Sequence, residues 1–449
     1  MLVSRSRMTW RVALYVLLGL SCLIAVYGWA RSSDDDGIDV ATKAEFLKAI
    51  RTADHGVTIR LAPGNYGRVR LQNIGNDLAP GERLVVTSAD PCNRATFEQV
   101  WIQSSANIIL SRLNFADPDF FADPKTSLKP DGSIRYLDLL RTEKTSALSI
   151  VDNTFVGPTI DRSGSRLNGF AHGTGWRAKD VSDVIFASNR VDNVWKGLSL
   201  QDMRSLRIAD NLVTDYRSDA IYVAGVQDLT VENNELRYPR PFTLPKGRGD
   251  HPDFMQVQGI EGGLIQNNLM MVGAQTGVSQ GIFPGDPARD LTVRNNILIS
   301  RARNGILLAN ISRSQVTNNL VLIAERLPRS VVPAAEAHTF DAAPQIRVGP
   351  NPRDVLVQRN ASSAANRRGS VARRVQAGLA GADAGVGPRP FMRLEPGAPE
   401  GTATAAGYRR IGDILFAQGT LDAAGIDVGK FAYLSDERPG DSRRCPRSA

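Results

Sequence analysis

Short apolar runs alternate with polar turns through the middle of the chain, and the alternation recurs at a fixed interval. One kind of run ends in Asn, as in residues 206–211 and 229–234, and uninterrupted copies follow one another after 22 or 23 residues. A second short run, such as 197–200 or 220–223, precedes each copy. A fixed period in this range is typical of stacked supersecondary units. Each unit holds at least two strands and no helical stretch, so the pattern predicts the coils of a parallel β-helix.

The recurring Asn residues predict an internal ladder. Asn tolerates the left-handed conformation of a sharp turn, and coils stack about 4.8 Å apart, so the amides can hydrogen-bond from coil to coil. We expect one internal line, and a looser copy of the run ends at Asn114. The Asn residues of the line are Asn189, Asn211, Asn234, Asn268, Asn296 and Asn319, with further copies ending at Asn153 and Asn360. A leucine-rich repeat also carries Asn, but its Leu-x-x-Leu-x-Leu frame is absent.

The chain resembles the right-handed parallel β-helix proteins of the pectate-lyase-like superfamily over residues 42–361. Thr42 and Glu45 form the signature of a capped helix start. The strand and Pro-Gly-Asn-Tyr turn that follow, at 57–66, are similar to the entry of chondroitinase-type and alginate-lyase-type β-helices. The resemblance implies an all-β solenoid with an N-terminal helical cap, acting on or binding a polysaccharide. It implies no particular reaction, because the order Asp250-His251-Pro252-Asp253 differs from the Asp-Pro-His triplet of alginate-type C5-epimerases.

The N-terminus predicts export. Arg5, Arg7 and Arg11 precede an apolar run at 12–30, and a polar stretch follows it. Residues 1–30 fit a signal peptide cleaved after Ala30, and they also fit a retained signal anchor that spans the membrane. Both alternatives place the β-helix outside the cytoplasm, in a periplasmic or extracellular location.

The rest of the chain divides by composition into a linker at 31–41, the β-helix domain at 42–361 and an irregular C-terminal region at 362–449. A small capping segment is expected at 408–434 in that region. Insertions at 115–136, 237–250 and 325–343 break the period and predict loops on one side of the solenoid. Cys92 and Cys445 fall near opposite ends of the predicted rod, so we expect no disulfide unless the tail folds back.

The net charge of +8 suggests an acidic partner. Arg pairs outside the repeats explain the same excess equally well. No Cys/His metal spacing and no nucleic-acid recognition motif is present, so we expect no nucleic acid as partner. The positive charge favours an acidic polysaccharide instead, and we expect a monomer.

Aligning the second runs by their apolar cores places polar residues in columns. The residue before each run gives Lys196, Asp219 and Asp253, followed by Gln280 and Asn304; two positions earlier come Arg217 and His251. The outward position inside the strand includes Tyr222 and Gln256. These seven residues, Lys196, Arg217, Asp219, Tyr222, His251, Asp253 and Gln256, are expected in one patch. A register shift of one residue would turn every side chain to the other face.

The patch suits acid–base chemistry on a uronate. Asp219 stacked on Asp253 forms a carboxylate pair that either raises one pKa or binds a cation such as Ca²⁺. Lys196 and Arg217 can neutralise a substrate carboxylate, and the basic loop at 237–250 offers Arg240, Lys246 and Arg248 to an anionic chain. We therefore favour a lyase or C5-epimerase that uses His251, Asp253, Asp219, Lys196 and Arg217, and binds substrate through Tyr222 and Gln256.

Three other interpretations remain at this point. The carboxylate pair also suits a glycoside hydrolase. A non-catalytic carbohydrate-binding or envelope-structural β-helix would instead present an exposed aromatic row, of which the outward column offers only Tyr222 and Phe283. Asp before a strand is also a common turn residue. An enzyme requires His251, Asp253 and a cationic side chain to converge.

Overall fold

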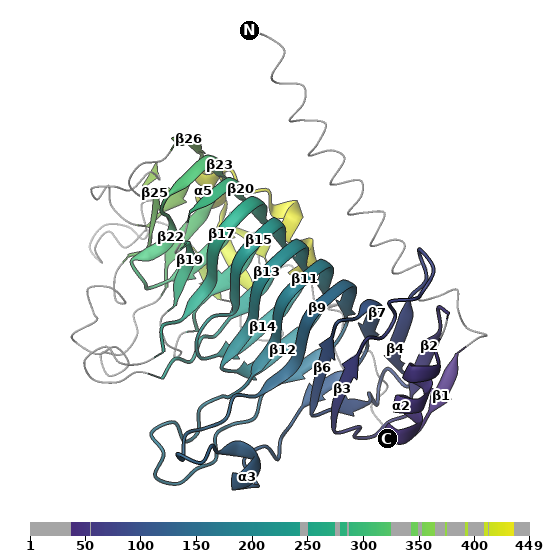
Figure 1. Ribbon diagram of the computed structural model, residues 1–449. Helices are drawn as coiled ribbons and strands as arrows, with labels where there is room; N and C mark the ends of the chain where they lie inside the picture. Colours follow the sequence, from purple (N-terminus) through teal and green to yellow (C-terminus); the bar gives the residue numbers. More distant parts are fainter. Residues whose placement is uncertain are drawn as a thin grey trace.

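The chain forms a parallel β-helix whose coils advance from the N-terminal to the C-terminal end of a rod (Figure 1). The computed structural model describes residues 37–53, 55–242, 250–273, 279–284, 287–324, 343–348, 353–363, 373–374, 391–393, 408–411 and 413–434. The signal or anchor segment at 1–30 lies outside this range, as do Lys246 and Arg248. Within the described part, no helix combines the length and apolar character needed to cross a bilayer.

Two parallel sheets form the coils of the described chain. The larger, 17-stranded sheet contains β1 (Ile38–Val40), β2 (Thr58–Leu61), β3 (Arg68–Gln72), β4 (Leu84–Ser88), β6 (Gln99–Gln103), β7 (Ala106–Ser111), β9 (Asp138–Val151), β11 (Thr174–Ala187), β13 (Lys196–Ala209), β15 (Ile221–Glu232), β17 (Asp253–Gln266), β19 (Gln280–Pro284), β20 (Ala288–Arg294), β22 (Asn304–Leu308), β23 (Ile311–Thr317), β25 (Gln345–Val348) and β26 (Arg353–Gln358). The 11-stranded sheet contains β5 (Thr96–Phe97), β8 (Asn114–Ala116), β10 (Thr154–Val156), β12 (Arg190–Val194), β14 (Leu212–Tyr216), β16 (Glu235–Arg237), β18 (Leu269–Met271), β21 (Ile297–Ser300), β24 (Leu320–Ile323), β27 (Ala361–Ser362) and β28 (Arg373–Arg374).

Each complete coil has three straight segments, one more than the minimum that the sequence predicts. In β13, Asp202 and Ser205 adopt the left-handed conformation, with φ of 53° and 51°. These two residues bend the 14-residue strand into two segments. The third segment comes from the smaller sheet, as in β14. Local side chains that tolerate positive φ therefore set the corners of the coil.

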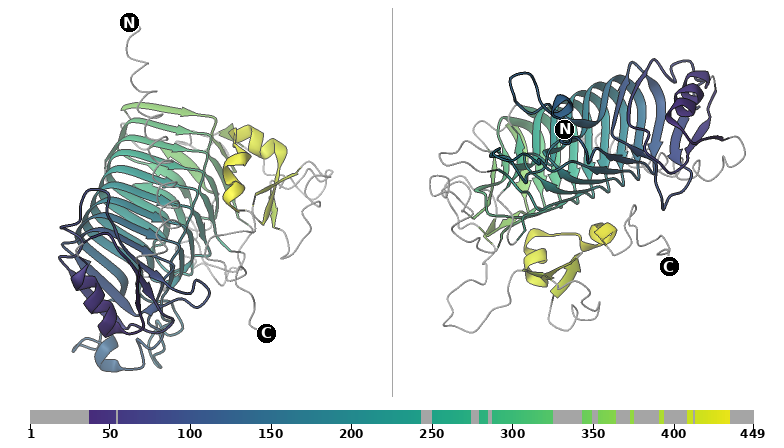
Figure 2. Two further views of the ribbon diagram at one scale, coloured as in Figure 1. Left: turned by 90° about the vertical axis from the view of Figure 1, so that its right-hand side faces the viewer. Right: turned by 90° about the horizontal axis from the view of Figure 1, so that it is seen from below.

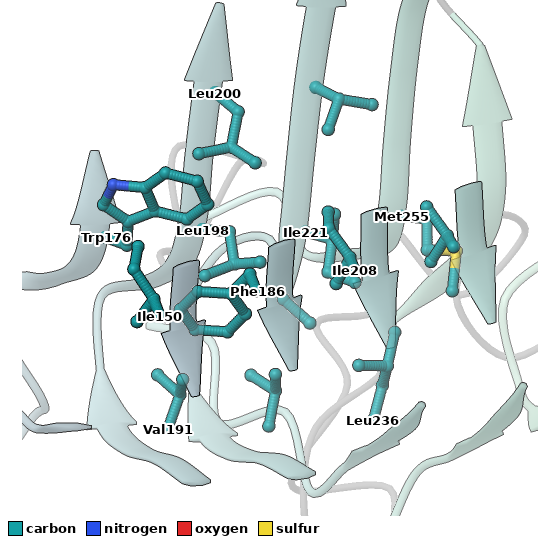
Figure 3. Packing of buried hydrophobic residues seen from close by; sticks show 14 of the residues in the cluster. Ile150, Trp176, Phe186, Val191, Leu198, Leu200, Ile208, Ile221, Leu236 and Met255 are labelled. Carbon is teal, nitrogen blue, oxygen red and sulfur yellow. The ribbon is translucent and has the colours of Figure 1, made fainter. Parts of the chain in front are cut away.

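The interior of the coil is filled by the inward-facing residues of all three segments. Figure 3 shows Trp176 of β11 stacked on Phe186, with ring centroids 5.2 Å apart, beside aliphatic side chains of neighbouring coils. Alternating burial along β3 and β6 is the period-two pattern that the sequence displays. The apolar core thus runs unbroken along the axis of the rod.

The predicted Asn ladder is confirmed and is longer than six members. Each ladder amide donates to the Oδ1 atom of the next Asn and to a backbone carbonyl of the preceding coil; Asn234 Nδ2, for example, lies 3.0 Å from Asn268 Oδ1 and 2.9 Å from the oxygen of Ile208. The line comprises Asn153, Asn189, Asn211, Asn234, Asn268, Asn296, Asn319 and Asn360, and all eight are buried. At this buried corner of the coil, the amides provide the hydrogen bonds that water would provide at an exposed turn.

Two details of the ladder differ from the sequence interpretation. The left-handed residue is the one before each ladder Asn, such as Asn233 before Asn234 and Asn267 before Asn268. Asn114 is not a member, because β8 pairs Asn114 with Thr154 and the backbone N–H of Leu113 donates to Asn153 Oδ1. The run at 108–111 pairs in register with 148–151, so Leu113 stands at the ladder position and Asn114 follows it.

Helix α2 (Lys43–Thr52) begins as the sequence predicts, with Thr42 as N-cap and Glu45 completing a capping box. It buries Phe46, Ala49 and Ile50 and lies at the N-terminal end of the rod (Figure 1). A short helix, α3 (Pro124–Ser127), lies in the insertion at 115–136.

The segment at 408–434 packs along the flank of the coils (Figure 2). It contains strands β30 (Tyr408–Ile411) and β31 (Ile414–Ala417), helix α5 (Gln418–Ala424) and the 3₁₀ helix η2 (Val428–Leu434); β29 (Phe391–Arg393) pairs with β31. Gly425 accepts a hydrogen bond from Asn318, Asp427 from Asn295, and Tyr433 donates to the oxygen of Asn267. The chain therefore turns back after the last coil and runs toward the N-terminal end.

Cys92 is disulfide-bonded, and the chain turns back along the flank, which is the condition under which the sequence allowed a bridge. The other cysteines, Cys22 and Cys445, lie outside the described residues. The return of the chain along the flank is the physical reason that the rod-end argument fails, since it brings late residues back toward early coils.

Candidate functional site

The predicted polar column is formed where the chain re-enters the large sheet. Asp253 of β17 pairs with Gln280 of β19. The backbone N–H of Gly197 donates to the oxygen of Asp219 at 3.0 Å, and that of Ala220 to the oxygen of Asp253 at 3.1 Å. Lys196, Asp219, Asp253 and Gln280 therefore occupy equivalent positions in successive coils, so the register deduced from the sequence is confirmed.

The residue after each column member faces the core: Gly197 and Gly281 follow Lys196 and Gln280, and the buried Ala220 and Phe254 follow the two aspartates. A Cβ atom on Gly197 would lie 2.9 Å from Val213 Cγ1, and one on Gly281 would lie 2.6 Å from Leu298 Cδ2. Both valine and leucine belong to the opposite, smaller sheet. The glycines thus face the interior, and the polar residues before them point to the outer side, beneath the loops.

Asp219 and Lys196 form a short ion pair within the column. Lys196 Nζ lies 2.6 Å from Asp219 Oδ2, and the Asp219 side chain is almost completely buried. The same ammonium group lies 4.9 Å from the centroid of the Tyr222 ring and 5.4 Å from that of Trp195. The Lys196 ammonium group therefore contacts both the buried Asp219 carboxylate and the aromatic rings of Tyr222 and Trp195.

Asp253 is the most perturbed carboxyl group of the column. Its side chain is 1% exposed, and neither carboxylate oxygen accepts a hydrogen bond from any described residue. Burial raises the pKa of Asp253 well above the ordinary value, the charge of Asp219 raises it further, and Lys196 partly opposes both effects. A buried carboxyl with a raised pKa beside a second carboxylate is typical of acid–base sites.

His251 lies against Asp253 on the solvent side. His251 Nδ1 is 3.9 Å from Asp253 Oδ2, and the imidazole is 63% exposed. Gln280 Nε2 lies 2.9 Å from His251 Nε2, and Asn304 Nδ2 donates to Gln280 Oε1 at 2.5 Å. The column members Gln280 and Asn304, to which the sequence assigned no role, thus orient the imidazole.

Tyr216 is a site residue that the sequence analysis missed. It ends β14 inside the coil, and its side chain is fully buried. Burial raises the pKa of its hydroxyl well above 10, and the charges of Asp219 and Asp253 raise it further. Tyr216 belongs to the smaller sheet, whereas Asp219 and Asp253 lie where the chain enters the larger one, so no period along one strand could relate them.

Arg217 lies outside the patch in which it was predicted. Its guanidinium binds Asp250 through two hydrogen bonds of 2.9 and 3.0 Å and donates to the oxygen of Ala171 at 3.0 Å. Asp250 in turn accepts a hydrogen bond from the backbone N–H of Phe242 at 2.8 Å. Arg217 therefore fastens two loops together and holds the residue directly before His251.

Replacing Arg217 by Lys should cost roughly 1–2 kcal/mol of stability, because an ammonium group keeps the charge and loses the bidentate geometry. Turnover should fall by about tenfold with little change in KM, since His251 loses its support while bound substrate keeps its contacts. Chemical denaturation and steady-state kinetics measure the two effects. A large rise in KM with normal stability would instead mean that Arg217 binds substrate directly.

The substrate-binding predictions divide into two groups. Tyr222 pairs with Ser199 and Gln256, and Gln256 with Phe283, so the outward column is in the expected register. Arg240 forms an ion pair within the chain: its Nε atom lies 2.6 Å from Asp215 Oδ1. Its side chain nevertheless remains 64% exposed at the edge of the loop.

The outward column is more aromatic and cationic than the sequence analysis indicated. It continues toward the N-terminus through Arg177, Arg141 and Trp101, which pair in successive coils. Tyr136 also lies on this side, 5.8 Å from Arg177 Cζ. The irregular insertion at 115–136 interrupts the period, so aligning later coils alone could not reveal these residues.

His172 fixes the insertion at 115–136 to the coil. Its Nε2 atom lies 2.8 Å from the oxygen of Arg135, and its ring stacks on Phe120 at 5.6 Å. Burial lowers the pKa of His172 to about 4, with a smaller contribution from the charge of Arg217. The imidazole is therefore neutral in the folded protein.

Acidification should destabilise the protein through His172. The unfolded chain gains a proton on this residue below about pH 6.5, whereas the folded chain resists it down to about pH 4. Stability should thus fall as the pH falls through this window, and His172→Gln should flatten that part of the curve. Thermal melts across the window measure both; equal slopes for the two proteins would contradict the assignment.

Among the described residues, no group of three or more His, Cys, Asp or Glu side chains is arranged to hold a metal ion. Asp219 and Asp253 alone supply two carboxylates, and the Lys196 ammonium already occupies one of the oxygens. The donor set around the stacked pair therefore does not fit the Ca²⁺ site that the sequence left open.

Comparisons with known proteins give structural likeness only. No protein-family model matches the chain, and no curated protein does. PL6 family alginate lyase AlyGC aligns over 72% of this chain and 38% of its own length, at 12% identity and a TM-score of 0.38. An alginate lyase from Paenibacillus sp. str. FPU-7 aligns over 72% and 98%, at 12% identity and a TM-score of 0.36.

DFA-IIIase from Arthrobacter chlorophenolicus A6 in complex with GF2 aligns over 72% of this chain and 85% of its own, at 12% identity and a TM-score of 0.44. The chain thus spans well under half the length of AlyGC. At these scores the likenesses carry no argument, and no residue role is transferred from them.

Proposed function

We propose that this chain is an exported enzyme that removes the proton alpha to the carboxylate of a uronate unit in an acidic polysaccharide. One observation carries the proposal: the exposed imidazole of His251 lies 3.9 Å from the buried carboxyl of Asp253, beside the Lys196–Asp219 ion pair. The convergence of His251, Asp253 and a cation is what the sequence analysis required of an enzyme.

In this proposal His251 is the base. Its Nε2 atom accepts a hydrogen bond from the Gln280 amide in the free chain, so the substrate displaces that bond before Nε2 takes the C5 proton. Asp253 lies on the Nδ1 side of the ring, where it stabilises the imidazolium that forms. The raised pKa of Asp253 matters here, because a more basic carboxylate shares the transferred proton more readily.

Lys196 is the electrophilic partner. Removal of the C5 proton places negative charge on the substrate carboxylate, and an ammonium group positioned in advance stabilises that charge. The pairing with buried Asp219 fixes the ammonium in place next to Tyr222. Elimination then breaks the C4–O bond and forms a C4–C5 double bond, and the leaving oxygen takes up a proton from the His251 imidazolium or from water. Epimerisation instead returns a proton from solvent to the opposite face of C5, and the imidazolium loses its proton to water.

A glycoside hydrolase is the second candidate. The stacked carboxyls of Asp219 and Asp253, one with a raised pKa, supply an acid and a base. Both are almost fully buried, and Lys196 holds one oxygen of Asp219. The exposed His251 makes proton abstraction the better fit.

Incubation with alginate, polygalacturonate and a glucuronate polymer tests the proposal. Absorbance in the ultraviolet detects unsaturated products, and exchange of the C5 proton with deuterated solvent, followed by NMR, detects epimerisation. Saturated reducing ends alone would support the hydrolase. No product and no exchange on any uronate polymer would refute the proposal.

Several further features belong to the same proposal. The disulfide bond of Cys92 favours an oxidising compartment, in agreement with an exported protein that is cleaved after Ala30 or anchored through residues 12–30. Helix α2 is proposed to cap the exposed end of a right-handed, pectate-lyase-like solenoid that acts as a monomer.

A further inference from the structure

An exposed aromatic pair lies next to the proposed reaction site. Tyr136 is 64% exposed, the most exposed of the large apolar side chains in the described chain. Its ring centroid lies 5.7 Å from that of Trp195, at an interplanar angle of 33°. Trp195 immediately precedes Lys196, so the pair adjoins the cation of the reaction site.

Three cations surround these rings. Lys129 Nζ lies 5.5 Å from the Tyr136 ring, and Arg177 Cζ lies 5.8 Å from it. Lys196 Nζ lies 5.4 Å from the Trp195 ring. An exposed ring bordered by ammonium and guanidinium groups matches a sugar that has apolar C–H faces and a carboxylate.

We infer that Tyr136 and Trp195 form a stacking subsite for a neighbouring uronate unit of an anionic polysaccharide. The carboxylate of that unit would bind Arg177 or Lys129. This inference rests on the proposed function for the identity of the adjacent reacting sugar, but the binding that it describes does not require turnover. It assigns the insertion at 115–136, which ends at Tyr136, to substrate recognition.

The direction of the bound polymer follows from the coil geometry. Trp195 and Lys196 lie one coil before Asp219, and coils are spaced by about 4.8 Å, comparable to the length of one pyranose unit. A polymer that lies along the axis of the rod thus meets one coil per sugar. Arg177, Arg141 and Trp101 continue this line toward the N-terminal end, so longer oligomers should bind more tightly than short ones.

Binding by a chain with blocked turnover tests the subsite. The full-length protein carrying Asp253→Asn would be titrated with alginate and polygalacturonate, with dextran as a neutral polymer. Adding Tyr136→Ala should weaken binding to the charged polymers by about tenfold, while Tyr136→Phe should retain it, because stacking uses the ring and not the hydroxyl. Leu356→Ala, at an exposed position on β26, is the matched control.

The outcomes separate this inference from the proposed function. Unchanged binding in a folded Tyr136→Ala protein overturns the subsite, and equal retention of dextran overturns its selectivity for anionic sugars. Binding that does not weaken with added salt removes the role of Arg177 and Lys129. If the unsubstituted chain transforms no uronate polymer but ring-dependent binding persists, the proposed reaction fails and the subsite stands.

Discussion

Replacing His251 by Ala, or Asp253 by Asn, should each lower turnover on a uronate polymer by about 10²–10⁴-fold, the usual contribution of a positioned acid or base. The first change removes the group that takes the proton. The second leaves its shape intact but removes the carboxylate that stabilises the imidazolium. Initial rates with the best substrate from the uronate panel measure both effects, and a double variant should be little worse than either single one.

The pH dependence of these variants provides the control. Activity should rise with pH as the buried Asp253, whose pKa burial and the charge of Asp219 raise, loses its proton, and Asp253→Asn should abolish that limb of the profile. His55→Ala, at the only other exposed His of the described chain, should leave rates and profile unchanged. Normal turnover in His251→Ala would exclude the proposed base.

Stability gives an independent measure of Asp253. Its raised pKa means that the folded chain holds the proton more tightly than the unfolded chain, so wild-type stability is lost as the pH rises from about 3.9 through the folded pKa. Asp253→Asn cannot ionise and should escape this loss. The variant should therefore gain in melting temperature relative to wild type as the pH rises; a parallel fall in both would argue against a buried, titrating Asp253.

Replacing Asn234 by Leu should cost roughly 1–3 kcal/mol of unfolding free energy, the largest stability effect we expect from a single ladder substitution. Asn234 Oδ1 accepts from both the backbone N–H and the amide of Asn211, at 3.1 and 2.9 Å. A leucine of similar size fills the space but leaves the buried N–H of Asn211 without an acceptor. Denaturant unfolding monitored by circular dichroism measures the loss.

Asn76→Leu is the matched control for the ladder substitution. Asn76 is exposed and donates one hydrogen bond, to the oxygen of Ser104 at 2.9 Å. Water replaces that bond, so the expected change is within about 0.5 kcal/mol. Equal costs at the two positions would mean that the ladder contributes no more than a surface amide.

Structural features that recur in every coil could be predicted from the sequence, whereas features that occur only once were predicted poorly. The ladder and the column of Lys196, Asp219 and Asp253 recur with the period, so their register could be deduced from apolar positions alone. Asn114 was misplaced because the early run, although in register with the next copy, has Leu113 at the ladder position and its Asn one residue later. Each coil restarts the same local pattern, and an error in one coil did not propagate to the next.

Contacts between different parts of the coil could not be predicted from the sequence. Tyr216 approaches the carboxylates from the smaller sheet, Arg217 binds Asp250 across a loop, and Tyr136 meets Trp195 from an insertion. None of these pairs has a fixed spacing along the chain. Their partners are set by how loops fold over the sheet, which depends on packing that a single sequence does not display.

The return of the chain along the flank changes how the rod resists opening. A solenoid with contacts only between adjacent coils unfolds by fraying from its ends, one unit at a time. Here a single continuous segment touches the turns at Asn318, Asn295 and Asn267, and Asp413 binds Arg237 of β16 through two hydrogen bonds. The coils that carry Asn318, Asn295 and Asn267 therefore cannot separate from one another without breaking contacts to this one segment. The C-terminal half should behave in hydrogen exchange as one cooperative unit, with similar protection along its length instead of a gradient toward the end.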